Sequence, residues 1–158
     1  MVAVDVRGAV LERARALGAE VVIDAAQDPD TATTIQEITR GGATVSIDAL
    51  GSPITALASV RCLRRRGRHV QVGLLLGDEA TPPIAMDGVI AWELEIHGSH
   101  GMAAHEYAPM LALIADGRLR PDLLLGEVIG LQDAPAALAA MDRPTSAAGI
   151  TVIDPRAM

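Results

Sequence analysis

Residues 41–53, Gly-Gly-Ala-Thr-Val-Ser-Ile-Asp-Ala-Leu-Gly-Ser-Pro, decide the fold of this chain. Residues 44–49 in their middle are β-branched and apolar, which predicts a short buried strand. Ser52 followed by Pro53 predicts a helix start, because a hydroxyl N-cap and a proline at the first helical position both favour one. A buried strand, a turn with glycine and then a helix are typical of a parallel α/β sheet.

Strand-like and helix-like segments alternate on both sides of this stretch. We expect further strands at 2–6, 21–23, 68–73, 84–86, 94–99 and 150–153. We expect helices at 8–17, 32–39, 53–63, 87–92, 105–116 and 133–141. Gly18 is placed to end the first helix as its C-terminal cap. Short buried strands that alternate with helices predict a parallel sheet with right-handed crossovers.

The composition excludes several classes of protein. The 158 residues suit one domain, and an apolar content of 50% excludes a disordered chain. One Trp, one Tyr and no Phe leave no aromatic platform for single-stranded nucleic acid, and a net charge of −7 argues against a phosphate-backbone binder. All 13 basic residues are Arg, which excludes a Schiff-base lysine and a P-loop lysine.

The chain is expected to be a cytoplasmic protein. A single cysteine, Cys62, excludes an intrachain disulfide and favours a reducing compartment. The N-terminus has no apolar run of signal length, and no stretch approaches the ~20 apolar residues of a membrane span. We interpret Cys62 as a small buried hydrophobic residue rather than a nucleophile.

Two polar features of the sequence each allow two interpretations. The basic run Arg64, Arg65, Arg66 and Arg68 is either a solvated helix end that complements the helix dipole or a contact with an anion or partner. Asp48, which closes an apolar strand, is either a cap for the following turn or a carboxylate of a ligand cleft.

Histidine and serine patterns carry little chemistry. His97, His100 and His105 have only Glu106 at a complementary spacing, so we interpret them as one cleft-lining and two loop histidines rather than metal ligands. The sequence has no G-x-S-x-G, which argues against acyl transfer.

Ligands of a doubly wound sheet bind beyond the carboxyl ends of its strands. The expected strands end at Asp5 and within residues 48–52, 72–75 and 97–100, and the last three ends carry a glycine that would let a ligand approach the backbone closely. The sequence has no G-x-G-x-x-G, so we interpret Asp5 by itself as an ordinary surface carboxylate.

Residues 41–52 and then 62–74 (Cys-Leu-Arg-Arg-Arg-Gly-Arg-His-Val-Gln-Val-Gly-Leu) resemble the coenzyme domain of the zinc-type medium-chain alcohol dehydrogenases. Residues 2–6 and 14–19 resemble that family's second strand and its following helix. Residues 94–99, 115–119 and 131–138 resemble its C-terminal part. The resemblance covers nearly the whole chain in order, and it implies an α/β, Rossmann-like, doubly wound parallel sheet.

The resemblance also implies an incomplete protein. The family's catalytic domain, its zinc ligands, and its first strand with the glycine-rich turn have no counterpart here. We expect a partial dinucleotide-binding domain at 1–120 and, at 121–158, a segment that packs on the catalytic domain in the family. Without the central strand, we expect two half-sheets or a direct pairing of the strands near Val4 and Ile47, with exposed edges that predict oligomerisation.

The resemblance implies cofactor contacts but no catalytic residue and no metal ligand. Asp5 would face the adenosine ribose and favour NAD over NADP, and Arg7 would soften that preference. Other implied contacts lie at later strand ends. Leu50 and Gly51 would line the cleft, Val72, Gly73 and Leu74 would pass beside the nicotinamide, and His97 would be a second carboxamide contact.

Two functions follow as hypotheses. In the first, the chain is the NAD(P)-binding portion of a zinc-type alcohol dehydrogenase, inactive alone, with NAD as cofactor and a second copy paired through residues 82–86. In the second, it is a non-catalytic binding or oligomerisation module derived from that domain. Neither hypothesis includes a nucleic acid or a membrane as partner.

Overall fold

The computed structural model describes residues 1–141, 143 and 149–157, which divide into two compact units. One unit joins Met1–Asp24 to the chain from Met102 onward, and the other is Ala25–Gly101. We call them the terminal unit and the central unit and describe each by itself.

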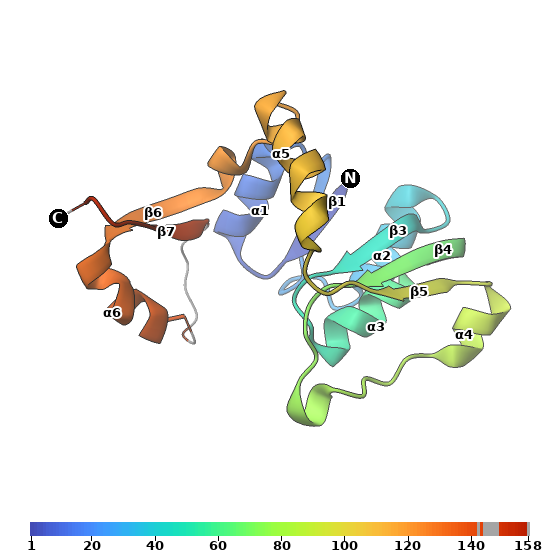
Figure 1. The fold of residues 1–158 in the computed structure, drawn as a ribbon. Helices are drawn as coiled ribbons and strands as arrows, with labels where there is room; N and C mark the ends of the chain where they lie inside the picture. Colours follow the sequence, from blue (N-terminus) through green and yellow to red (C-terminus); the bar gives the residue numbers. More distant parts are fainter. Residues whose placement is uncertain (142, 144–148, 158) are drawn as a thin grey trace. The chain divides into compact units, whose positions relative to one another are not determined.

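The central unit is a three-stranded parallel sheet with helices. The strands are β3 (Ala43–Asp48), β4 (Leu63–Gln71) and β5 (Glu95–Gly98), in the order β3-β4-β5. The helices are α2 (Thr31–Thr39), α3 (Pro53–Arg61) and α4 (Met86–Ala91), with a 3-10 turn η1 at Gly77–Glu79. Figure 1 shows α3 lying along the sheet, and α3 contacts both β3 and β4.

Helix α3 begins where the sequence predicts. The Ser52 hydroxyl accepts a hydrogen bond from Thr55 N (3.1 Å), and the Thr55 hydroxyl accepts one from Ser52 N (3.2 Å). This capping box satisfies two of the N–H groups that a helix start leaves without partners, and Pro53 occupies the first turn. The helix buries Ala56 and Val60.

The core of the central unit is partly polar. Its buried side chains include Leu63 and His69, each 1% exposed, together with Cys62 and Asp48. The β3–β4 register pairs Ser46 with His69.

The terminal unit holds two separate two-stranded parallel sheets. One contains β1 (Val2–Asp5) and β2 (Val21–Asp24), and the other contains β6 (Leu125–Gly130) and β7 (Ile150–Asp154). Its helices are α1 (Gly8–Ala16), α5 (Tyr107–Ala115) and α6 (Ala134–Ala139), with 3-10 turns η2 (Ala104–Glu106), η3 (Pro121–Leu124) and η4 (Leu131–Asp133).

Helix α1 organises the terminal unit. Leu11 is its buried residue, and the unit's core also contains Ala19 and Ile23. Gly18 ends the helix in a left-handed conformation (φ 100°), as predicted. The Arg13 guanidinium donates hydrogen bonds to the carbonyls of Leu124 (3.3 Å) and Leu125 (3.0 Å), which ties α1 to the start of β6.

The expected α/β class with parallel strands is confirmed. Of the two arrangements expected around the missing strand, the described strands adopt the separate half-sheets, because β1 pairs with β2 and β3 pairs with β4. Apolar side chains are exposed toward the end of the chain, since Val128, Leu138 and Ile150 are each more than half exposed. The division at residue 120 stays a prediction.

The expected edge strand at 84–86 is wrong. Residues 82–85 form no ladder in the described structure, and Met86 begins α4. Pro82 and Pro83 have no N–H groups to donate to a neighbouring strand, which weakens any ladder at this point.

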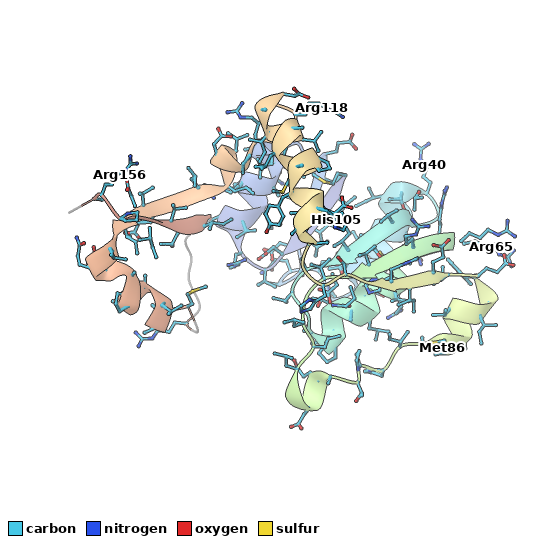
Figure 2. All side chains as sticks on the ribbon, viewed as in Figure 1. Arg40, Arg65, Met86, His105, Arg118 and Arg156 are labelled. Atoms are coloured by element: carbon cyan, nitrogen blue, oxygen red, sulfur yellow. The ribbon has the colours of Figure 1, made fainter. Side chains whose placement is uncertain are left out.

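The helix-end interpretation of the basic run is also wrong. Helix α3 ends at Arg61, and Arg64–Arg66 lie in β4. The β3–β4 register jumps from Ala43↔Leu63 to Val45↔Arg68, so residues 64–67 form a bulge. Figure 2 shows Arg65 extending away from the ribbon, and its side chain is exposed.

One strand was not expected. β6 contains Gly126 and Gly130, and glycine disfavours strands, so the sequence pattern there is weak. Its pairing with the distant β7 forms the ladder. Among the described residues, no helix combines the length and apolarity needed to cross a membrane.

We predict that Ser52→Ala lowers the free energy of unfolding of the central unit by about 1 kcal/mol, because it removes the side-chain acceptor at the start of α3. Fluorescence of Trp92, the only tryptophan and a residue of this unit, in urea titrations measures the change. An unchanged urea midpoint would contradict it.

Candidate functional site

The turns after β3 and β4 pack backbone against backbone at the carboxyl edge of the central sheet. Gly51 has a left-handed φ of 83°, and a Cβ there would lie 2.6 Å from the carbonyl carbon of Gly73. A Cβ on Gly73 would collide with the backbone of Leu50 and Gly51. Each of these glycines therefore lets the other turn approach. The structure thus gives these glycines a role in the fold, and their role in the approach of a ligand stays a prediction.

Gly98, at the end of β5, is different. A Cβ there would meet no heavy atom within 4 Å, so the backbone at this strand end is open in the described structure.

The buried Asp48 carboxylate fixes the first of these turns. Its Oδ1 accepts hydrogen bonds from Leu50 N (3.0 Å) and Gly51 N (3.2 Å), and its Oδ2 accepts one from Gln71 Nε2 (2.8 Å). Burial acts to raise the pKa of Asp48, but these hydrogen bonds hold that pKa below its ordinary value. Of the two interpretations kept above, the structure favours the turn cap.

Residues 72–74 use part of their backbone within the unit. Val72 N and Gly73 N both donate to the Asp48 carbonyl at 2.9 Å, and Gly73 O accepts from Gln71 Nε2 at 2.9 Å. No hydrogen bond among the described residues uses Val72 O or Leu74 N. The segment therefore presents one free acceptor and one free donor, next to the exposed side chains of Leu50 and Leu74.

The sequence pattern assigned no role to His69. This buried side chain lies between β4 and α3, where its Nδ1 is 3.0 Å from Ser59 Oγ and its Nε2 is 3.1 Å from Gln71 Oε1. Side chains alternate along a strand, so His69 and Gln71 project from the same face of β4. Two polar residues at alternate positions of a buried strand, His69 and Gln71, were the feature of the sequence that could have pointed to this role.

His97 lies on β5 with its side chain half exposed. Its register partner is Val70, the neighbour of His69 in sequence, so His97 lies on the sheet face opposite His69. His97 Nε2 is 3.0 Å from Glu95 Oε2, which also accepts from Arg68 (2.7 Å). Arg68, followed by His97, lowers the pKa of the Glu95 carboxyl.

Cys62 is a buried thiol, as predicted. Its Sγ donates to the Ser59 carbonyl at 3.2 Å, and burial raises the pKa of the thiol to about 11. A thiol with this pKa is almost entirely protonated at neutral pH, so it is a poor nucleophile. In the part of the chain that the structure describes, no group of three His, Cys, Asp or Glu side chains is placed to hold a metal ion.

Asp5 and Arg7 form a local pair in the terminal unit. Asp5 ends β1, and its Oδ1 accepts hydrogen bonds from Arg7 N (2.9 Å) and Arg7 Nε (3.1 Å), while Oδ2 accepts one from Arg7 Nη2 (3.2 Å). Burial acts to raise the pKa of Asp5, but Arg7 lowers it below the ordinary value. The carboxylate is therefore ionised at neutral pH and partly neutralised by its neighbour.

We predict that Gly73→Ala destabilises the central unit by about 1–3 kcal/mol, since the new Cβ collides with backbone that cannot rotate away as a side chain would. Gly98→Ala is the matched control, with an expected change within about 0.5 kcal/mol. Urea titrations of Trp92 fluorescence measure both. Equal costs would show that the turns do not need their close contact.

We predict that the stability cost of Asp48→Asn depends on pH. The folded pKa of Asp48 lies below its ordinary 3.8, so the carboxylate stabilises the fold above that pH and loses this effect as the pH falls through the folded value. The gap in unfolding free energy between the parent chain and the variant is expected to be widest near neutral pH and to narrow below pH 3.8. A gap that stays constant with pH would contradict the assignment.

Comparison with known proteins shows which family this chain resembles. The profile of the zinc-binding dehydrogenase family matches residues 1–116. D-arabitol-phosphate dehydrogenase of Enterococcus avium is 29% identical over 116 residues, which are 73% of this chain and 32% of that protein.

Two solved structures share the fold. 2R,3R-butanediol dehydrogenase from Bacillus subtilis superposes with a TM-score of 0.84 at 22% identity, over 98% of this chain and 43% of that one. The alcohol dehydrogenase rspB from E. coli CFT073, solved in complex with NADH, gives a TM-score of 0.82 at 20% identity, over 96% of this chain and 43% of that one. This sequence thus spans about a third of the first relative and less than half of each solved chain. The chain belongs to the zinc-binding dehydrogenase family, and it corresponds to the Rossmann-like C-terminal domain of the medium-chain alcohol dehydrogenases.

Proposed function

We propose that this chain binds the nicotinamide end of NAD(H) at the carboxyl edge of its central sheet, as the cofactor-binding part of an alcohol dehydrogenase. The backbone of residues 72–74 carries the proposal. A carboxamide has one N–H₂ donor and one carbonyl acceptor, and the free Val72 O and Leu74 N form the complementary pair. Leu50 and Leu74 supply exposed apolar surface for the ring.

Two further contacts are proposed from the same edge. His97 is a second carboxamide contact through its strand end, where the backbone at Gly98 is open. Gly51 contributes the shape of the cleft wall rather than a hydrogen bond, because its N–H is held by Asp48.

Asp5 is proposed to bind the adenosine ribose. An ionised carboxylate at the end of a strand accepts hydrogen bonds from ribose hydroxyls and repels the 2′-phosphate of NADP. Arg7 already occupies part of that carboxylate and offers a guanidinium to a phosphate, so we expect NAD to be preferred by a small factor only.

The residues present do not fit the zinc that this family's name implies. The single cysteine is buried with a raised pKa, and the described residues contain no cluster of metal-ligating side chains. No step of zinc-assisted chemistry is derived for this chain.

A non-catalytic assembly role is the second candidate. It is favoured by the exposed apolar side chains of Val128, Leu138 and Ile150 in the terminal unit. Pairing of two copies through residues 82–86 is proposed with both functions, although these residues form no ladder within the described chain. Light scattering that shows a monomer at micromolar concentration would contradict both the assembly role and this pairing.

The test is a thermal melt of the chain with NADH, and then with NADPH. Ligand at about 100 times its dissociation constant should add about 2.7 kcal/mol of stability. Asp5→Ser is expected to weaken NADH binding and bring the two affinities closer together. Asp154→Ser is the matched control, because Asp154 ends β7 and pairs with Arg156 in the same way. A cooperative melt indifferent to NADH would favour the assembly role.

A further inference from the structure

We propose that His69, a buried side chain without a role in the family resemblance, is the positioning residue that holds both turns of the proposed cofactor cleft through Gln71. The cleft itself rests on the proposed function. The chain of hydrogen bonds runs from Ser59 on α3 through His69 and Gln71 to Asp48 and to the carbonyl of Gly73.

The direction of each hydrogen bond follows from which atoms can donate a hydrogen and which can only accept one. Gln71 Nε2 lies 2.8 Å from Asp48 Oδ2 and 2.9 Å from Gly73 O, and both of these atoms only accept. The amide nitrogen of Gln71 must therefore face them, which leaves Gln71 Oε1 to accept from His69 Nε2–H at 3.1 Å. This places a hydrogen on Nε2 of the His69 imidazole.

The other side of the imidazole is consistent with that tautomer. His69 Nδ1 then accepts a hydrogen bond from the Ser59 hydroxyl at 3.0 Å, and the Ser46 hydroxyl lies farther away at 3.4 Å. No buried side-chain nitrogen or oxygen among the described residues lacks a hydrogen-bond partner. His69 therefore supports the same orientation of the Gln71 amide that Asp48 and Gly73 require.

In that orientation the Gln71 amide nitrogen is linked to each of the two turns through a different acceptor. Through Asp48, whose other oxygen accepts from Leu50 N and Gly51 N, it fixes the turn after β3. Through the carbonyl of Gly73 it fixes the turn after β4. The His69 donor supplies the third hydrogen bond of the Gln71 amide, so losing it leaves Gln71 less firmly held and is expected to loosen both turns at once.

Two substitutions of His69 separate positioning from core filling. The terminal amide of a glutamine reaches the place of histidine Nε2, whereas that of an asparagine reaches only the place of Nδ1. His69→Gln keeps a donor for Gln71 Oε1, and His69→Asn loses it, while both leave a polar side chain in the same buried place.

We expect His69→Asn to raise the dissociation constant for NADH about three- to tenfold, as for the loss of one net hydrogen bond, and His69→Gln to stay near the parent value. Amide hydrogen exchange by NMR supplies the second measurement. Exchange at Leu50 and Gly51 should quicken in His69→Asn and not in His69→Gln.

The exchange measurement separates this inference from the proposed function. Parent chain that fails to bind NADH would refute the function, while faster exchange in His69→Asn alone would still support the positioning. Equal exchange in both variants would overturn the positioning, whatever happens to NADH affinity. If His69→Asn does not fold, Gln71→Met cuts the same link, and unchanged exchange at Leu50 and Gly51 would again overturn it.

Discussion

The buried carboxylate of Asp48 needs hydrogen-bond donors, and this need determines how the central unit folds around it. Asp48 is 4% exposed and carries a charge, and a buried charge without partners would cost several kcal/mol. Two turn N–H groups and the Gln71 amide supply its hydrogen bonds. The turn after β3 must therefore fold back over Asp48, and Gln71 must point inward from β4.

The close approach of the two turns follows from the same constraint. The Asp48 side chain binds one turn, and the Asp48 carbonyl accepts Val72 N and Gly73 N of the other. Two turns anchored on one residue lie too close for a Cβ at Gly51 or Gly73. Their glycines thus serve the fold first, and the cleft proposed above has a wall made of backbone.

Each unit carries a proposed contact of its own. The terminal unit has Asp5 at the end of β1, and the central unit has the edge formed by residues 50–51 and 72–74. Each part has local geometry that suits its role, since Asp5 is ionised beside Arg7 and the edge retains Val72 O and Leu74 N. The described residues include no cluster of side chains that could hold zinc, and no zinc site is proposed among them.

By itself the sequence determined the α/β class, most helices and strands, the Ser52–Pro53 helix start, the Gly18 cap and the buried Cys62, because these depend on local periodicity and capping. Only the tertiary structure decided the rest. Strand β6 depends on its partner β7, the expected strand at 84–86 has no ladder partner, and the Arg64–Arg66 bulge comes from a register jump. The reasons for Gly51 and Gly73, and the link from His69 to Asp48, arise from atoms of different strands that meet only in the folded sheet.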